Sequence, residues 1–411
     1  MKIVISGYYG SKNAGDEAML AAMLEVLREI EPNINVTVIS VNPEDTRKRH
    51  HVDAVAWLNI FAIIKKIFNA DLLISGGGSL LQNVTSRRSL YYYLGIIFFA
   101  EMLLRPVMLY AQGIGPIRGT FAKKLTHFII NRVNLITVRD HGSLEELKQL
   151  NIMKPQVFCT ADPVLAIKPA NLDIGREILS RYDEDKFIDD SKTPLIGIAV
   201  RRWHGWQNCQ AELAKSMDMI VKKFHARIIF LPMQYPEDLR AAKSVAELSN
   251  ADCTILNEEY KTGELLSLVG CMDVLISIRL HALIFAGVMN VPMLGISYDP
   301  KIDRFLNSIG ENPLGKLDGV TSEDILSAVE QKIHLKSKQH QDMELLKNLH
   351  DKARKNAELA INLIKSRQKN SLRECFDYKK EQRRFLLKIC IKNLNTDSVQ
   401  TNFIKFQFKL R

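Results

Sequence analysis

Short apolar runs alternate with amphipathic helical patterns over the first two-thirds of the chain. Ile3–Ser6 is typical of a buried strand, and apolar residues at helical spacing predict a helix from about Ala18 to Ile30. Further strands are predicted in the first part of the chain at Val36–Ser40, Leu72–Ser75, Val107–Ala111 and Leu135–Val138. Strands this apolar are typical of a parallel sheet that is covered by helices on both faces.

The same alternation restarts at Leu195 after a polar segment. Pro169, a charged helical pattern and the acidic run 183–185 indicate a linker over residues 168–194. Beyond it, strands are predicted at Leu195–Val200, Ile228–Leu231, Cys253–Leu256, Val274–Ser277 and Met293–Ile296. We therefore expect α/β domains over residues 1–167 and 195–342, a closing helix over 343–370 and a basic tail over 371–411. Ligands are expected in the cleft between the domains, at the carboxyl ends of the strands.

Composition excludes several classes of protein. Of the 411 residues, 46% are hydrophobic and 25% charged, which is typical of a globular protein rather than a disordered one. The first residues run directly into a strand, so no secretory leader is expected. The longest apolar stretch, Leu90–Met108, is interrupted by Glu101 and Arg105 and is not expected to span a membrane. The six cysteines form no CxxC pair, which favours reduced thiols and a cytoplasmic location.

The net charge of +10 is concentrated at the C-terminal end. Residues 365–411 hold thirteen basic and four acidic residues, and the rest of the chain is nearly neutral. Basic amphipathic segments bind anionic lipid, so the tail is expected either to associate with the inner face of the cytoplasmic membrane or to be disordered, solvated charge. Trp57–Phe68 is a second candidate membrane segment, with a helix packed on the sheet as its alternative. Nucleic acid is not an expected partner.

Three glycine-rich turns follow strands of the first domain, at residues 7–15, 75–79 and 112–116. Glycine lets the backbone approach a ligand closely, and N–H groups at a helix start favour anions. None of the three matches the dinucleotide fingerprint or the P-loop. Each alone is typical of an ordinary strand-to-helix turn, but three at one edge of a sheet favour a binding wall.

The second domain places cationic side chains after its strands. Arg201, Arg279, His281 and Lys301 each follow a predicted strand, so they are expected to converge on one small anion in the cleft. A histidine there can pass a proton near neutral pH. The alternative for Arg279 and His281 is that both are buried residues at a helix start that satisfy backbone carbonyls.

Other candidate sites carry less weight. Asp183 and Asp185 are spaced like a metal-binding pair but are expected to lie in a solvated loop. His50 and His51 are expected in a charged loop without partners at metal-ligand spacing. No serine or cysteine lies in a nucleophile elbow. The residues therefore predict neither a metal site nor covalent catalysis.

Seven short motifs occur in a fixed order between residue 1 and about residue 365. They are Ser6–Gly10 with Asn13–Ala18, Leu73–Gln82, Tyr110–Pro116, Thr137–Asp140, Thr160–Val164, Ser277–Ala282 and Gly295–Lys301. As a set they resemble the polysaccharide pyruvyl transferase family, most closely its cell-wall (CsaB-type) branch. The resemblance implies a GT-B-like α/β fold, with two Rossmann-like domains facing across a cleft.

The resemblance also implies an activity. Pyruvate would pass from phosphoenolpyruvate to two hydroxyls of a cell-wall sugar as a cyclic ketal, with release of phosphate and without a metal or organic cofactor. The acceptor would be an oligosaccharide linked to polyprenyl diphosphate and ending in N-acetylmannosamine. A GT-B glycosyltransferase with a nucleotide-sugar donor and a non-catalytic membrane-associated binding protein remain alternatives. The number of subunits stays open, a homo-oligomer included.

Roles for single residues follow from the same resemblance. Arg201, Arg279, Leu280 and Lys301 would bind the donor, and His281 would protonate its methylene carbon. Asp16 would orient or deprotonate an acceptor hydroxyl. The acceptor side would be formed by Tyr9, Asn13, Gly15, Glu17, Gly77, Gly78, Gln112 and Arg139, with Arg139 on either the acceptor diphosphate or the donor.

Overall fold

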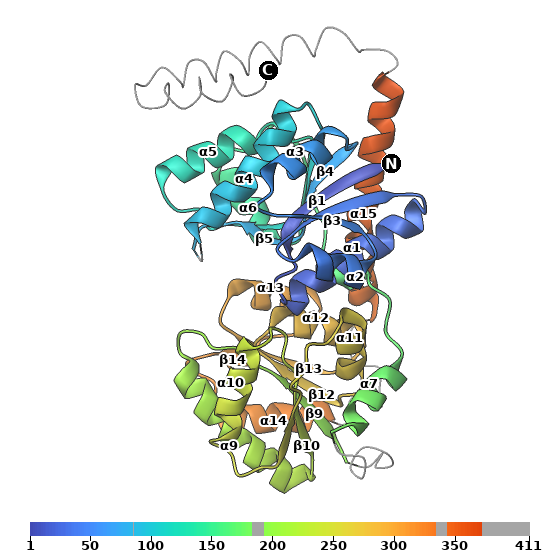
Figure 1. The fold of residues 1–411 in the computed structure, drawn as a ribbon. Helices are drawn as coiled ribbons and strands as arrows, with labels where there is room; N and C mark the ends of the chain where they lie inside the picture. Colours follow the sequence, from blue (N-terminus) through green and yellow to red (C-terminus); the bar gives the residue numbers. More distant parts are fainter. Residues whose placement is uncertain (85, 183–192, 334–342, 372–411) are drawn as a thin grey trace.

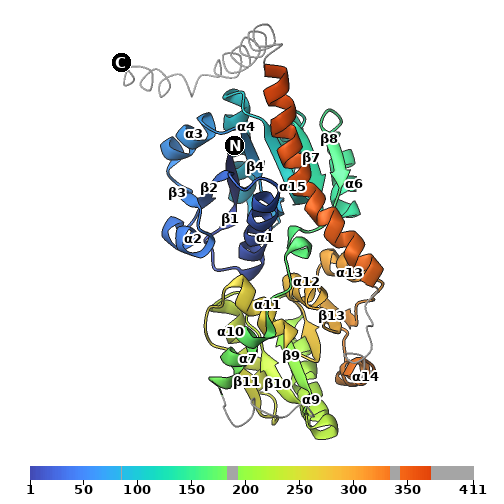
Figure 2. The ribbon, with the colours of Figure 1, turned by 90° about the vertical axis from the view of Figure 1, so that its right-hand side faces the viewer.

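Two parallel β-sheets form the centres of two α/β domains in the computed structural model, which describes residues 1–84, 86–182, 193–333 and 343–371 (Figures 1 and 2). The first sheet runs in the order β3-β2-β1-β4-β6-β7-β8, with β5 paired to β6. Its strands are β1 (Lys2–Tyr9), β2 (Asn35–Ser40), β3 (Asp53–Ala56), β4 (Leu72–Ser75), β5 (Gly78–Leu81), β6 (Val107–Ile114), β7 (Leu135–Val138) and β8 (Gln156–Cys159).

Helices cover both faces of this sheet. One face carries α3 (Ile60–Phe68), α4 (Arg87–Met102), α5 (Thr120–Ile130) and α6 (His141–Gln149), whose buried side chains share one apolar core with the sheet. The other face carries α1 (Ala14–Ile30), the short 3-10 helix η1 (Pro163–Ala166) and the long α15 (Met343–Ser371). The remaining helix of the domain, α2 (Pro43–His50), packs on β2 and β3.

The second sheet has the order β11-β10-β9-β12-β13-β14, which is the strand order of a dinucleotide-binding Rossmann sheet. Its strands are β9 (Leu195–Ala199), β10 (Arg227–Phe230), β11 (Cys253–Ile255), β12 (Val274–Ser277), β13 (Met293–Ser297) and β14 (Gly315–Lys316). Its helices are α7 (Leu172–Ser180), α9 (Trp206–Phe224), α10 (Glu237–Ala246), α11 (Thr262–Gly270), α12 (Leu280–Val288), α13 (Pro300–Ser308) and α14 (Ser322–Ile333).

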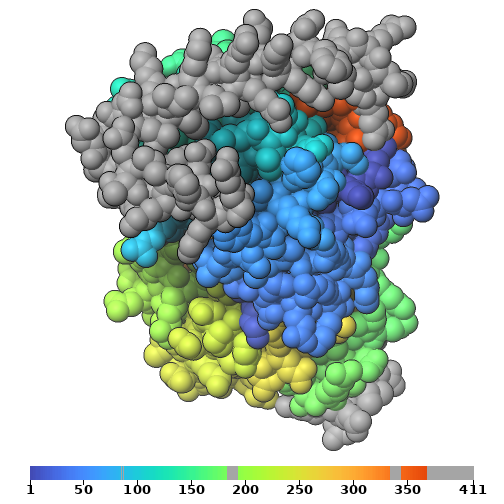
Figure 3. Space-filling model, turned by 45° about the horizontal axis from the view of Figure 1, so that its top comes forward, coloured from blue at the N-terminus to red at the C-terminus, as the bar shows by residue number. Residues whose placement is uncertain are grey.

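The two domains are in direct contact. The core formed by α1, η1 and α15 continues into α11 and α12 of the second domain, and a space-filling view shows the blue and yellow surfaces meeting (Figure 3). After the second domain the chain returns to the first as α15, which lies along it (Figure 2). There Arg354 forms an ion pair with Glu29 at 2.7 Å, and buried Asn356 accepts a hydrogen bond from Thr160. The two domains therefore share one continuous apolar core.

The parallel α/β architecture predicted from the sequence is confirmed, and the predicted strands lie within a few residues of the observed ones. Helix α1 begins four residues earlier than expected because Asn13 caps it. The expectation that His50 lies in a loop is wrong, since it ends α2 and is buried. In the segment 168–194, α7 packs against α11 rather than standing free.

Two candidate membrane segments were expected from the sequence. Helix α3 packs on the sheet through Ile63 and Ile67 but leaves Phe61 and Phe68 exposed. The tail 371–411 lies outside the described residues except for Ser371, and so do Asp183 and Asp185. Among the helices that the structure describes, none combines the length and hydropathy of a membrane span.

Candidate active site between the two domains

The start of α1 is held against the second domain. Asn13 is extended, and its side-chain oxygen accepts hydrogen bonds from the N–H groups of Gly15 at 3.0 Å and Asp16 at 3.4 Å. The N–H of Ala14 donates to the carbonyl of Met233 at 2.8 Å, and Asn13 forms a β-bridge with Gln234. Capping and this bridge together place Asp16 at the domain interface.

His281, in the first turn of α12, lies directly over Gly15. A Cβ atom at Gly15 would be only 2.0 Å from His281 Nδ1, so no larger residue fits there. His281 Nε2 lies 3.8 Å from Asp162 Oδ2 and makes no hydrogen bond within the described residues. An imidazole nitrogen that is buried and unpaired is available to a substrate.

Arg139 and Asp162 form a nearly buried ion pair beneath His281. Arg139, which follows β7, donates from Nη1 to Asp162 Oδ2 at 2.6 Å and from Nη2 to Ser79 Oγ at 3.2 Å. Its guanidinium also lies against Gly113, so the second and third glycine-rich turns both meet it. Asp162 was not among the expected site residues, although it lies inside the Thr160–Val164 motif.

Burial moves the pKa values of the two candidate catalytic groups in opposite directions. It raises the pKa of half-buried Asp16 to about 7, helped by the neighbouring Glu17 and opposed by Arg139. It lowers the pKa of His281 to about 4; Asp162 opposes this fall, while Arg139 and Lys301 add to it. At neutral pH the histidine is therefore uncharged and the carboxyl is about half protonated.

Two of the expected donor cations lie on one aromatic ring. Arg201, after β9, donates to the Tyr298 hydroxyl at 2.8 Å, with its guanidinium carbon 5.3 Å from the ring centroid. Lys301 Nζ lies 5.9 Å from the same centroid and 3.3 Å from Asp299 Oδ2. Trp203 also stacks on Arg201, beside a cavity of about 600 Å³ lined by residues 202–208 and 210. The ends of β9 and β13 thus present two cations together.

Arg279 has a partner inside the second domain. Its Nε donates to Asp238 Oδ2 at 2.9 Å, its Nη2 contacts Asp238 Oδ1, and both side chains are buried. Arg279 therefore pairs with a carboxylate and not with the backbone carbonyl that was the alternative expectation. The Leu280 side chain is buried in the core. Leu280 still begins α12, where backbone N–H groups have no intrahelical acceptor.

Three expected acceptor residues are buried within the first domain. Tyr9 is fully buried and contacts Met23 Sδ through its hydroxyl at 3.7 Å. Gln112 donates to the carbonyls of Gly76 at 2.8 Å and Gly78 at 3.0 Å, so it holds the second glycine-rich turn. Both side chains are therefore enclosed by the first domain.

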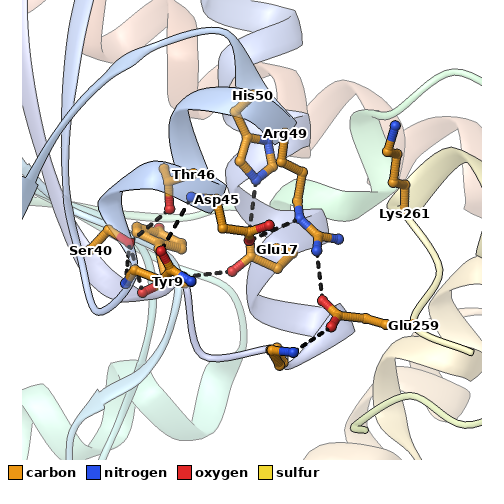
Figure 4. Close-up of polar contacts among 12 residues, drawn as sticks. Tyr9, Glu17, Ser40, Asp45, Thr46, Arg49, His50, Glu259 and Lys261 are labelled. Carbon is orange, nitrogen blue, oxygen red and sulfur yellow. Dashed lines mark hydrogen bonds and ion pairs between the residues drawn. The ribbon is translucent and has the colours of Figure 1, made fainter.

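Glu17 is the third of these buried residues. It accepts a hydrogen bond from the Gly10 N–H at 2.7 Å and lies 2.7 Å from His50 Nε2 (Figure 4). Beside this pair, Arg49 reaches Glu259 of the second domain at 2.6 Å, and Lys12 reaches it at 2.9 Å. This cluster ties α2 and the first glycine-rich turn to the second domain.

Of the two glycines expected in the second turn, Gly78 lies near Asp16 and Gly77 packs against Met19. Gly78 has a left-handed backbone with φ of 99°, and a Cβ there would lie 3.4 Å from Asp16 Oδ1. A Cβ at Gly77 would lie 3.0 Å from Met19 Sδ. The structure therefore gathers Asp16, Gly15, Gly78, Arg139 and His281 at the domain interface and brings Arg201 and Lys301 together at Tyr298. Lys301 is close enough to affect the pKa values of Asp16 and His281.

Two sequence comparisons relate the chain to known proteins. The sequence profile of the polysaccharide pyruvyl transferase family matches residues 13–300. Amylovoran biosynthesis protein AmsJ of Erwinia amylovora is 20% identical in an alignment of length 367 that spans 75% of this chain and 86% of that protein.

Solved structures show the same fold. UDP-GlcNAc 2-epimerase of Methanocaldococcus jannaschii superposes with a TM-score of 0.63 at 14% identity and covers 88% of this chain and all of its own. A glycosyltransferase of Rickettsia africae gives a TM-score of 0.53 at 13% identity over 89% of this chain and 96% of its own. At such identities the likeness shows the GT-B fold alone. The profile match spans more than half of the chain. This protein therefore belongs to the polysaccharide pyruvyl transferase family and is an enzyme of that class.

Proposed function

We propose that the enzyme transfers pyruvate from phosphoenolpyruvate to two hydroxyls of a lipid-linked cell-wall sugar and releases phosphate. The observation that carries this proposal is the meeting of His281 and Asp16 at Gly15 on the domain interface, close enough to Lys301, one of the two cations at Tyr298, for that lysine to affect both pKa values. The acceptor would lie at the inner leaflet of the cytoplasmic membrane, where the basic tail 371–411 would bind.

Charge complementarity supports the donor. Phosphoenolpyruvate carries a carboxylate and a phosphate, and Arg201 offers a two-pronged donor while Lys301 offers a point charge. Both cations also stabilise charge on the departing phosphate, an effect often worth ~3 kcal/mol per well-placed group. Arg279 is compensated by Asp238, so its proposed part is to hold the first turn of α12 in place.

The pKa directions suggest how protons move. The group with the higher pKa, Asp16, acts as the acid, and the neutral His281 acts as the base. This reverses the roles that the sequence suggested. The negative donor offsets the surrounding cations, which raises both pKa values and keeps Asp16 protonated when the donor is bound. Arg139, paired with Asp162, would set this environment rather than hold a diphosphate.

The proposed reaction balances without a cofactor. Asp16 gives a proton to the methylene carbon, and the C2 cation that results is attacked by the first hydroxyl, whose proton goes to His281. The C2–O bond to phosphate then breaks, and the second hydroxyl closes the ring. Its proton restores Asp16, and the proton on His281 leaves with the phosphate. One donor and one diol give one ketal and one hydrogen phosphate.

The test is to follow phosphate release by the purified protein. We expect phosphate only when phosphoenolpyruvate and an N-acetylmannosamine-terminated, polyprenyl-diphosphate-linked acceptor are both present. Lys301→Met is expected to raise the KM for the donor at least tenfold, whereas Lys222→Met, on the exposed end of α9, should not. Turnover with a nucleotide sugar and none with phosphoenolpyruvate would establish a glycosyltransferase instead. No turnover with either donor would contradict the proposal and favour a binding protein.

A further inference from the structure

The outer surface of the first domain is apolar where a surface helix is ordinarily polar. Along α4, the residues that face away from the sheet are spaced three or four apart: Tyr91, Gly95, Phe99 and Met102. Tyr91, Phe99 and Met102 are exposed, and a Cβ at Gly95 would meet nothing within 4 Å. An amphipathic surface helix would carry charged or polar side chains at such positions.

The neighbouring helices extend this surface. Helices α3 and α5 flank α4 on the same face of the sheet (Figure 1). Phe61 of α3 is 75% exposed and Phe121 of α5 is 69% exposed. Tyr91 and Phe121 have ring centroids 6.2 Å apart, and Trp57 lies 5.6 Å from Tyr92. The exposed apolar side chains of α3, α4 and α5 therefore form one patch, here called the α3–α5 face.

Positive charge surrounds this patch. The segments 57–68, 87–105 and 115–134 contain nine lysines and arginines and a single acidic residue, so they carry a formal +8, although Lys66 among them is paired with Asp53 of β3. Lys65, Arg88, Lys123 and Lys124 are exposed. Since the whole chain carries +10 and residues 365–411 carry +9, the remaining residues carry −7. By sequence, the three segments are thus basic, whereas the rest of the chain before residue 365 is acidic.

Glu101 is the one acidic residue of these segments, and its carboxyl contributes little negative charge. Neither carboxyl oxygen of Glu101 has a hydrogen-bond partner in the described structure, and both are buried. Burial raises the pKa of Glu101 to about 8, against a smaller opposing effect of Arg132. The carboxyl is therefore mostly neutral at pH 7.

We propose that the α3–α5 face docks on an anionic lipid bilayer, with its aromatic side chains in the headgroup region and its cations on the lipid phosphates. Anionic bilayers bind protein surfaces that expose large aromatic residues together with lysines and arginines. The basic tail and a second copy of this face could also cover an apolar patch. Both are positively charged like the face itself, so charge repulsion disfavours them. The inference deepens the proposed function by placing the enzyme on the membrane of a lipid-linked acceptor.

The test is binding of the full-length protein to vesicles without any substrate. We expect binding to phosphatidylcholine vesicles that contain phosphatidylglycerol, with weaker binding at high salt and to phosphatidylcholine alone. Lys65→Gln with Lys123→Gln should weaken binding about 30-fold, at ~1 kcal/mol per cation. Phe61→Ser with Phe121→Ser should weaken it at least tenfold. All four positions are exposed, so folding should be retained.

Matched variants lie on the second domain. Lys222→Gln with Lys243→Gln removes the same charge there, and Leu248→Ser removes an exposed apolar side chain; neither should change vesicle binding. The face variants should transfer pyruvate to a soluble acceptor analogue as well as the natural protein does. Equal vesicle binding by face and control variants would show that the tail alone binds and would overturn the proposal. Loss of a dimer in the face variants, with no vesicle binding by the natural protein, would assign the face to a second copy.

Discussion

Single residues decide the geometry of this active site, and Gly15 does so most directly. Because Gly15 has no Cβ, the His281 ring from the other domain can lie on the backbone next to Asp16. The proposed acid and the proposed base thus belong to different domains, and the absence of a side chain at Gly15 lets them come close. Glycine here serves close approach, not a left-handed turn.

Replacing Gly15 by alanine tests this contact. The added Cβ would need the space of His281 Nδ1, so the ring must move, and displacement of a catalytic group by about 1 Å costs on the order of 100-fold in rate. We expect Gly15→Ala to lower kcat by about that factor with little change in donor affinity. Gly263→Ala is the control, because a Cβ there meets nothing within 4 Å. Unchanged kcat in Gly15→Ala would show that the ring does not act in the reaction.

The roles of Asp16 and His281 can be separated by pH. With Asp16 as acid and His281 as base, kcat/KM of the natural enzyme falls above about pH 7 and below about pH 4. The reversed roles give the same curve, so the decisive profile is that of Asp16→Asn. Its residual activity should be level from about pH 5 upward if His281 is the base. A steady rise of that activity toward pH 4 would instead make His281 the acid.

At the scale of elements, the local pattern predicted the strands well and the partners of charged residues poorly. Leu72–Ser75, Leu135–Val138 and Val274–Ser277 form strands with the predicted bounds because apolar runs between turn residues are a local signal. The Arg279–Asp238 pair joins residues 41 apart in the sequence, and no local pattern indicates it. Tyr9 and Glu17 lie in recognisable motifs, but their burial is set by packing across the domain.

The burial of Glu101 on helix α4 should make the free energy of unfolding depend on pH. Because its folded pKa is raised from 4.5 to about 8, its contribution to stability is full below about pH 4.5 and is lost as the pH rises through 8. The free energy of unfolding of Glu101→Gln, relative to the natural protein, should therefore rise between pH 5 and pH 9, by roughly 2 kcal/mol after allowance for partial exposure. Denaturant unfolding at the two pH values measures it.

The control for this prediction is Glu247→Gln, at the exposed end of α10. Because this side chain is exposed, its removal should change the free energy of unfolding little at either pH value. If the difference in free energy of unfolding between Glu101→Gln and the natural protein did not change with pH either, this carboxyl would be ionised at low pH in the folded protein. That would contradict the raised pKa.

At the scale of the whole molecule, the interface between the domains holds the site together. Apart from the shared core, Glu259 of the second domain pairs with Arg49 of the first (Figure 4). It also pairs with Lys12. These contacts lie on the same stretch of α1, α2 and the first glycine-rich turn that positions Asp16. The sequence predicted two facing domains, but neither end of this contact is marked by any motif.

A double-mutant cycle measures this contact. We expect Arg49→Gln and Glu259→Gln to couple by about 0.5–1 kcal/mol in the free energy of unfolding, since the pair is partly exposed. High salt should reduce the coupling. Coupling near zero at low salt would mean that the pair does not contribute to holding the domains together.

The central claim is that the three-carbon unit of phosphoenolpyruvate ends on the acceptor sugar as a ketal. Phosphoenolpyruvate labelled with carbon-13 at C2 tests it most directly, with the product followed by NMR. We expect the label to appear as one ketal carbon on the acceptor, with one phosphate released per ketal, and Lys301→Met to slow both equally. Phosphate released without a labelled acceptor, or an acceptor that gains a sugar instead, would contradict the account.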